Sequence, residues 1–177
     1  MRLSKSLQET SHRKFFFLMT SLLFIFILAA GCGSEEMKED EFIVFTGQGV
    51  NNVSIGDLGS KAAGSLGSGY TELFNNFGDG DALFYMQYSN LGIQIAMKIG
   101  PENSDVESLR INRIKFFGSF SGMTEEGIRI GSTLTEVQAI YGIGDVDSFG
   151  SHSYDDIGIF FNYDQNDEVE DFTVYTP

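Results

Sequence analysis

The chain has one cysteine, no tryptophan, two histidines and two prolines among its 177 residues. A single cysteine, Cys32, excludes an intrachain disulfide and any metal site built from several thiolates. Of the two histidines, His12 lies in the N-terminal segment, so only His152 is available for chemistry in the rest of the chain. This composition excludes Cys/His nucleophilic catalysis and a zinc site of ordinary make-up.

Basic residues are also scarce. The chain has 11 Lys and Arg against 25 Asp and Glu, which gives a formal net charge of −14. Binding to nucleic acid depends on clustered basic side chains that neutralise phosphates, so nucleic acid is excluded as a partner. Anionic lipid headgroups repel such a surface as well, so charge alone does not hold this chain to a membrane.

The N-terminus has the layout of a secretory signal, with a short basic segment followed by a hydrophobic run from Phe15 to Leu28. This run is shorter than the roughly 20 apolar residues that a membrane-spanning helix needs. Small residues follow at 29–31 and lead directly to Cys32. The segment therefore predicts export. An uncleaved signal anchor, or ordinary cleavage that leaves Cys32 as a free thiol, are the alternatives.

Leu28-Ala29-Ala30-Gly31-Cys32 resembles the lipobox of bacterial lipoproteins. That resemblance implies cleavage after residue 31, a diacylglyceryl group on the Cys32 sulfur, and lipid anchoring of the mature chain. Two or three acyl chains hold a water-soluble body on a bilayer almost permanently. The acidic stretch 32–41 then reads as a solvated tether. Gly33 resembles the pattern that directs lipoproteins to the outer membrane in bacteria with two membranes.

Beyond the tether, the chain contains two stretches that match each other. Tyr88-Ser89-Asn90-Leu91-Gly92-Ile93 corresponds to Tyr154-Asp155-Asp156-Ile157-Gly158-Ile159, and Ile55-Gly56 corresponds to Ile130-Gly131. The two matches differ in offset, so the first unit is expected to carry a longer loop around residues 75–81. We therefore expect two units, 42–120 and 121–177.

The second unit has a clear helix signature. Thr133 and Glu136 have the spacing of a capping box, and Gly142 is placed to end a helix that begins near Thr133. A second helix near residues 57–66 is weakened by Gly59 and Gly64. Alternating apolar residues predict strands after each helix. In the first unit, Ile93, Ile95, Met97 and Ile99 are expected on one face, and Gln94, Ala96 and Lys98 on the other. A change of phase between Ile111 and Ile114 predicts a β-bulge or a twist that swaps the faces.

These elements predict an α+β protein of two tandem units, each a short helix packed on about three antiparallel strands. The segment from Thr124 to Ser132, with Glu136-Val137, Tyr141-Gly142 and the Gly-Ile strand that follows, is similar to the repeat of the β-lactamase-inhibitor-protein-like superfamily. It also resembles the small outer-membrane lipoproteins of the barrel-assembly machinery (SmpA/OmlA type). The matching motifs are structural, so the resemblance implies a fold and no particular activity.

The sequence favours a non-catalytic protein-interaction or inhibitor-like module. Outside residues 1–31 the chain has 12 Phe and 7 Tyr, and we do not expect a core of this size to bury all of them. Phe74 and Phe77, expected in the long loop, are the candidates for an exposed patch that binds a protein partner. Phe117 and Phe120, at the junction of the two units, are expected in the core.

Two alternative functions are kept open. Asp164, Asn166 and Glu168 alternate as in the start of a calcium loop, although Val169 stands where that loop needs glycine. A solvated β-turn explains the same residues. A hydrolase would have to use His152, but Ser151 and Ser153 are its strand neighbours and point to the opposite face. We expect His152 on the surface at the start of a strand, and we expect no cofactor.

Overall fold

The computed structural model describes residues 42–78, 80–102 and 104–177, all of which belong to one compact unit. The expected signal peptide 1–31, the tether 32–41 and the lipidation site Cys32 lie outside the described residues. Among the helices of the described part, none has the length and apolar character needed to cross a bilayer.

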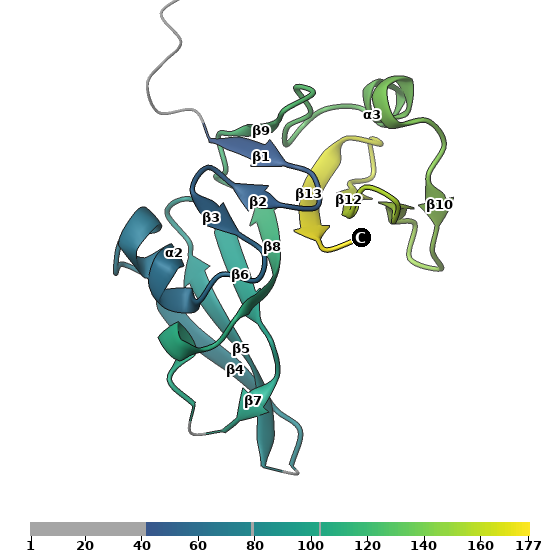
Figure 1. The fold of residues 1–177 in the computed structure, drawn as a ribbon. Coiled ribbons are helices and arrows are strands. Elements are labelled where there is room, and N and C mark those ends of the chain that lie inside the picture. Colours follow the sequence, from purple (N-terminus) through teal and green to yellow (C-terminus); the bar gives the residue numbers. More distant parts are fainter. Residues whose placement is uncertain (1–41, 79, 103) are drawn as a thin grey trace, which may run out of the picture. The chain divides into compact units, whose positions relative to one another are not determined.

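One large antiparallel sheet dominates the fold (Figure 1). Its strands lie in the spatial order β10 (Asp145–Val146), β11 (His152–Tyr154), β12 (Ile159–Tyr163), β13 (Val169–Tyr175), β8 (Ile111–Phe117), β6 (Ile93–Met97), β5 (Asp81–Tyr88) and β4 (Thr71–Asn76), and β7 (Gly100–Pro101) pairs with β5. The residues before 120 and those after 121 therefore share one sheet, because β8 and β13 pair over Arg113–Phe117 and Asp171–Tyr175.

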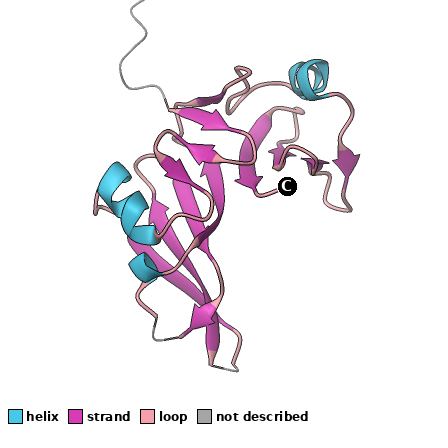
Figure 2. Cartoon of the chain, viewed as in Figure 1, coloured by secondary structure: helices cyan, strands magenta, loops and turns pink. Residues whose placement is uncertain are grey.

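The remaining elements cover one face of this sheet (Figure 2). They are a small sheet of β3 (Val53–Ser54), β2 (Gly49–Val50), β1 (Ile43–Phe45) and β9 (Met123–Thr124), the helices α2 (Gly59–Leu66) and α3 (Leu134–Tyr141), and the short 3-10 helix η1 (Val106–Ser108). Val44, Val50, Ala62 and Val137 bring these elements into the same buried cluster as the large sheet.

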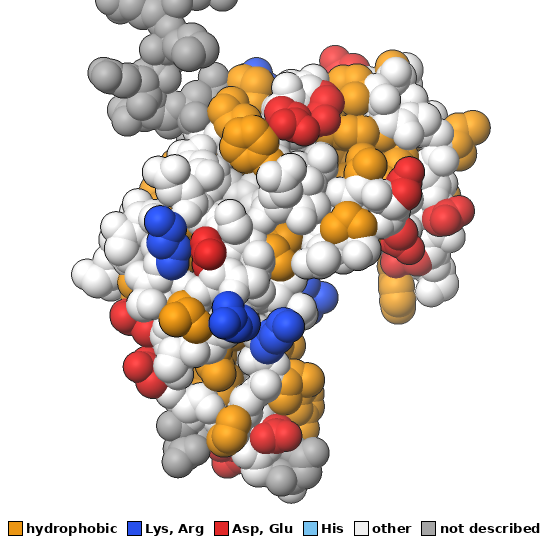
Figure 3. All heavy atoms as spheres, in the orientation of Figure 1, with side chains coloured by type: hydrophobic (Ala, Val, Ile, Leu, Met, Phe, Trp, Pro, Cys, Tyr) orange, Lys and Arg blue, Asp and Glu red, His pale blue; other side chains and the backbone are white. Residues whose placement is uncertain are grey.

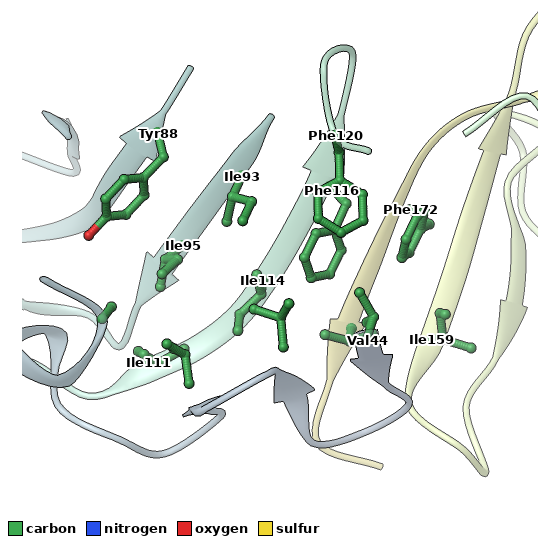
Figure 4. Close-up of a cluster of buried hydrophobic side chains, with 14 of the residues drawn as sticks. Val44, Tyr88, Ile93, Ile95, Ile111, Ile114, Phe116, Phe120, Ile159 and Phe172 are labelled. Atoms are coloured by element: carbon green, nitrogen blue, oxygen red, sulfur yellow. The ribbon is translucent and has the colours of Figure 1, made fainter. Parts of the chain in front are cut away.

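Alternation along the strands separates a covered face from an uncovered one. In β5, Ala82, Phe84, Met86 and Tyr88 are buried, whereas the residues between them are half-buried on the other face. Across the middle of the sheet, a row of side chains from neighbouring strands points into the same core (Figure 4): Tyr88, Ile93, Phe116 and Phe172. Burial of each large apolar side chain contributes about 1.5–3 kcal/mol.

The coarse fold class is confirmed: the described chain is mostly β-sheet with two short α-helices. The helix predicted near Thr133 is α3, with Thr133 as its N-cap. Thr133 Oγ1 accepts the Glu136 N–H at 3.3 Å, and Glu136 Oε2 accepts the Thr133 N–H at 2.7 Å. The helix ends at Gly142, whose φ is +82°. The weaker helix forms as α2, without a side-chain cap.

The predicted bulge is also present. Ala96 pairs with Arg113 whereas Met97 pairs with Ile111, so Asn112 is the extra residue in β8. The bulge lets both Ile111 and Ile114 point into the core. The alternation expected to bury Ile99 with Ile93 fails, because β6 ends at Met97 and Ile99 is 59% exposed.

A set of backbone hydrogen bonds occurs twice. In each half of the sheet, backbone groups around the start of the helix bond to backbone groups around the start of a strand. The strand is β8 for helix α2 and β13 for helix α3. Around α2, Gly56 N–H donates to Ile111 O, Ile111 N–H to Asp57 O, and Gly59 N–H to Leu109 O. Around α3, the corresponding bonds are Gly131 N–H to Val169 O, Val169 N–H to Ser132 O, and Leu134 N–H to Asp167 O. In each half, four strands of the sheet path follow the helix, one more than the number expected.

Candidate functional site

We call the side of the large sheet opposite the core the open face. This face is hollowed. Three adjoining hollows of about 460, 250 and 450 Å³ lie on it. The first two share Arg113 and Phe160, and the last two share Gln94 and Lys115. They therefore form one trough that crosses the middle strands. The trough is lined by Tyr85, Gln87, Gln94, Ala96, Asn112, Arg113, Lys115, Phe117, Gly118, Asp147, Ser151, Ser153, Asp155, Phe160, Glu170, Asp171, Thr173, Tyr175 and Thr176.

A chain of polar contacts crosses the open face from Ser151, which directly precedes β11, to β8. Ser151 Oγ donates to Asn162 Oδ1 at 2.5 Å, and Asn162 Nδ2 donates to Asp171 Oδ1 at 2.6 Å. The second oxygen of Asp171 lies 2.8 Å from Lys115 Nζ. Because Asp171 is held on both sides and its side chain is only 13% exposed, its position is defined before any partner binds.

The end of the trough near β10 and β11 brings both charge signs together. Arg113, Asp147 and Asp155 line the same hollow. Asp147 accepts the N–H groups of Ser151 and Phe149 at 3.0 and 2.8 Å, and these bonds lower its pKa below the ordinary value. Tyr175 donates its hydroxyl to Asp155, and burial raises the pKa of Tyr175. The site therefore offers a guanidinium donor and two carboxylate acceptors, and the Asp147 carboxylate is held in place by backbone hydrogen bonds.

Phe74 and Phe77 are exposed, with 57% and 53% of their surfaces accessible. The expectation that both lie in a long loop is wrong for Phe74, which lies in strand β4 with its ring 5.9 Å from that of Phe84. Phe77 lies in the turn that joins β4 to β5. Residues 71–76 pair with 82–87, so the stretch where a long loop was expected forms a β-hairpin. Figure 3 shows hydrophobic side chains at this end of the molecule, over β4, β5 and β7.

The residues expected at the junction differ from each other. Phe120 is in the core, 5% exposed, with its ring 4.6 Å from that of Phe116. Phe117, on the other face of β8, is half-buried and lines the trough. Phe116 and Phe117 are neighbours in β8, so they point to opposite faces of the sheet. Phe120 packs with Phe116 on the core side, and Phe117 lies on the open face.

The three residues proposed as calcium ligands lie in the turn between β12 and β13. Asp164 Oδ1 accepts the N–H groups of Asn166 and Glu168 at 2.8 and 3.0 Å, and these bonds lower the pKa of Asp164. Its Oδ2 accepts from Asn166 Nδ2 at 3.0 Å. Both Asp164 oxygens therefore stabilise the turn. In the part of the chain that the structure describes, no three His, Cys, Asp or Glu side chains gather as a metal site.

His152 is the first residue of β11, as expected, but its ring is half-buried on the covered face of the sheet instead of lying on the surface. It packs edge-on against Tyr163 with ring centroids 5.1 Å apart. Its Nδ1 is buried without a hydrogen-bond partner in the described structure. Ser151 Oγ bonds to Asn162, and Ser153 Oγ donates to the Asp145 carbonyl at 3.5 Å. Neither serine is in place to give a proton to His152.

The trough residues were not identified from the sequence. Gln94 was expected only as an outward residue of an alternating strand, and Lys115 was not singled out. Arg113 and Asp155 are distant in sequence, and only the pairing of β13 with β8 brings them to one hollow. A half-buried aromatic at an outward position, such as Phe160, is the local signal that points to such a face.

No family model, curated protein or solved structure matches this chain.

Proposed function

We propose that this protein is an exported lipoprotein whose body is a non-catalytic protein-interaction module. Lipid on Cys32, after removal of residues 1–31, would anchor the body through the acidic tether 32–41. In a bacterium with two membranes, Gly33 favours the outer one. The support is the basic, hydrophobic and small-residue order that ends at Cys32.

The trough on the open face is the observation that carries the interaction role. It combines aromatic rings with a guanidinium and carboxylates on a sheet whose other face is fully used by the core. A partner that fits it is an extended protein segment carrying a basic side chain toward Asp147 and Asp155. An acidic side chain or a backbone carbonyl of the same segment would accept from Arg113. Phe160 and Tyr175 would supply the apolar contact at the centre.

Phe74 and Phe77 are proposed as a second contact region of the same module. Two rings that are each more than half exposed at one end of a sheet are a common feature of protein interfaces. Neither ring lines the trough, so the two regions can be tested separately.

We further propose that residues 42–120 and 121–177 are two tandem units of common origin, similar to the repeat of the β-lactamase-inhibitor-protein-like superfamily. The twofold occurrence of the hydrogen bonds that link each helix entry to β8 or β13 supports this proposal. Gly92 and Gly158 support it too, because both have positive φ and both approach a carbonyl of that same strand.

The anchor is tested at Cys32. The mass of the N-terminal peptide of the native protein should correspond to an acylated cysteine, and Cys32→Ser should move the protein from the membrane to the soluble exported fraction. A free thiol at Cys32, or a Cys32→Ser chain that stays with the membrane, would contradict lipid anchoring.

The trough is tested with a photo-crosslinking residue at Ser153 of the full chain in its native membrane. The expected result is one specific adduct that disappears when Arg113→Glu is added. Lys61→Glu is the matched control, since Lys61 is an exposed cation on α2 and lines none of the three hollows. An adduct that survives Arg113→Glu would remove the trough from the partner contact.

Weak calcium binding is the alternative function, through Asp164, Asn166 and Glu168. Calcium at about a hundred times its dissociation constant would raise the unfolding free energy by about 2.7 kcal/mol. A calcium-dependent rise in melting temperature that Asp164→Asn abolishes would favour this alternative. A hydrolase is the weaker alternative, and His152→Ala would abolish such an activity.

A further inference from the structure

Strand β4 is the last strand at one end of the large sheet, and all its residues from Thr71 to Asn76 are exposed. It pairs with β5 without a register shift and contains no proline, lysine or bulge. Edge strands are normally shortened or blocked by such features, because a free row of backbone N–H and C=O groups templates another strand. The opposite edge, β10, has two residues, one of them Asp145. β4 is six residues long and carries one charge, Glu72, so it is the less protected of the two edges.

The pairing with β5 decides which backbone groups of β4 point outward. The Phe77 N–H donates to the Asp81 carbonyl at 3.1 Å, so Phe77 belongs to a hydrogen-bonded pair. Such pairs alternate with non-hydrogen-bonded pairs along an antiparallel ladder. The backbone groups of Glu72, Phe74 and Asn76 consequently point away from β5. An added antiparallel strand would bond to these residues.

We propose that the strand added at this edge is β4 of a second copy of this chain. The two copies are related by a twofold axis that passes midway between Phe74 of one copy and Phe74 of the other, which is called the axis through Phe74 below. Residues whose backbone groups point outward must face such residues of the second copy. The axis therefore has to place one position of the strand directly opposite the same position of the second copy. Phe74 is the midpoint of the segment 71–77. The axis through Phe74 therefore gives the greatest overlap of the two strands.

This register avoids opposing the only charge of the strand to itself. Glu72 faces Asn76 of the second copy, whose Oδ1 already accepts the Gly78 N–H at 2.6 Å, so its amide nitrogen is the group left to donate. An axis through Glu72 would instead place two carboxylates opposite each other. For a chain of net charge −14, a contact between copies needs such a segment of low charge.

The apolar side chains of the segment are used in the same register. Phe74 faces Phe74 of the second copy, and Phe77 faces Thr71 of the second copy. Each of the two exposed rings therefore gains a neighbour. The interface is isologous, closes after two copies and continues the large sheet from one copy into the other. The inference rests on the proposed function in one respect: it names the partner of the Phe74 and Phe77 contact region, and it leaves the trough free.

The oligomeric state of the full chain, purified in detergent, tests the proposal. Sedimentation should give twice the monomer mass at micromolar concentration for the native chain and the monomer mass for Phe74→Glu, which brings two carboxylates together at the axis. Val146→Glu is the matched control at the other edge, where Val146 is 58% exposed, and it should stay dimeric. A monomeric native chain, or a Phe74→Glu chain that is still dimeric, would overturn the proposal.

Disulfide trapping tests the register without depending on a destabilised variant. Oxidised Phe74→Cys should form a covalent dimer, because directly opposite residues of a hydrogen-bonded pair have Cα atoms about 5.5 Å apart, within disulfide range. Leu73→Cys should not, since Leu73 faces Asn75 of the second copy and points to the other side of the sheet. The native chain under the same oxidant gives the background from Cys32. Trapping of Leu73→Cys but not Phe74→Cys would overturn the proposed axis.

The two proposals fail in different experiments. Loss of the dimer with an intact Ser153 adduct would overturn the β4 contact and leave the interaction role of the trough standing. A dimer without any Arg113-dependent adduct would uphold the β4 contact and remove the trough.

Discussion

Phe116 of β8 and Phe172 of β13 stack across the seam where the two halves of the large sheet meet, with ring centroids 4.9 Å apart and an angle of 29° between the rings. Both side chains are fully buried. Phe120 closes over them, 4.6 Å from Phe116 and 6.0 Å from Phe172. This cluster joins residues more than fifty positions apart, so the two halves are expected to unfold together.

Phe172→Ala should lower the free energy of unfolding by about 3–5 kcal/mol, because it removes a buried ring and leaves a cavity at the seam. Urea unfolding followed by both circular dichroism and tyrosine fluorescence measures this loss and should give one coincident transition. Phe149→Ala is the control, since Phe149 is 93% exposed and its replacement should change stability by less than about 0.5 kcal/mol. Two separate transitions in the native chain would contradict a shared core.

Gly92→Ala should destabilise the protein by more than about 1 kcal/mol. Gly92 has φ +66°, and a Cβ there would lie 2.2 Å from the Phe117 carbonyl oxygen. Gly158→Ala should behave alike, with the Tyr175 carbonyl oxygen at 2.1 Å. Gly64→Ala is the opposite case, because Gly64 lies in α2 with open space around it, and it should gain about 0.5–1 kcal/mol. Thermal melting of the three variants ranks them, and a harmless Gly92→Ala would refute this turn geometry.

Thr133→Ala should cost about 1 kcal/mol, because it removes the side-chain half of the capping box at the start of α3. Thr135→Ala is the matched control within the same helix, since Thr135 is exposed and makes no cap, and alanine has the higher helix propensity. Chemical denaturation of both variants gives the comparison. Equal effects at the two threonines would mean that the cap does not stabilise the fold.

Stability should fall as the pH rises above 10. Burial raises the pKa of Tyr88 from 10.0 to about 12, and the hydrogen bond to Glu107 raises that of Tyr70 to about 12. Both folded-state values lie above the unfolded value. The stabilisation is therefore complete below pH 10 and is lost as the pH rises from 10 toward 12, where the unfolded chain ionises first.

Urea unfolding at pH 8 and at pH 11 measures this alkaline loss. The Tyr88 hydroxyl is buried without a partner in the described structure, so Tyr88→Phe should be tolerated at pH 8 and should reduce the loss at pH 11. A Tyr88→Phe chain that is as sensitive to alkali as the native one would contradict the assignment.

Much of the local structure could be predicted from neighbouring residues. The capping box of α3 needs only Thr133 and Glu136, and the bulge in β8 showed as a change of phase between Ile111 and Ile114. Predictions failed where distant partners decide. Ile99 continues an apolar alternation, yet β6 ends before it and leaves it exposed. Phe74 was expected in a long loop because the two matching stretches differ in offset, but pairing with Phe84 extends the hairpin through Asn76.

The amino-acid sequence by itself determined the order of basic, hydrophobic and small residues that ends at Cys32, on which the proposed export rests. It also determined the scarcity of catalytic groups, the α3 helix and the apolar faces of the strands. The α3 helix and the apolar faces depend on residues within a few positions of one another, whereas the scarcity of catalytic groups is a matter of composition. Only the tertiary structure decided which outward side chains become neighbours and which edge of the sheet stays unpaired. Arg113, Asp155 and Phe160 meet in one hollow, and β4 lies at an edge, because strands distant in the chain pair through backbone hydrogen bonds that carry no residue-specific signal.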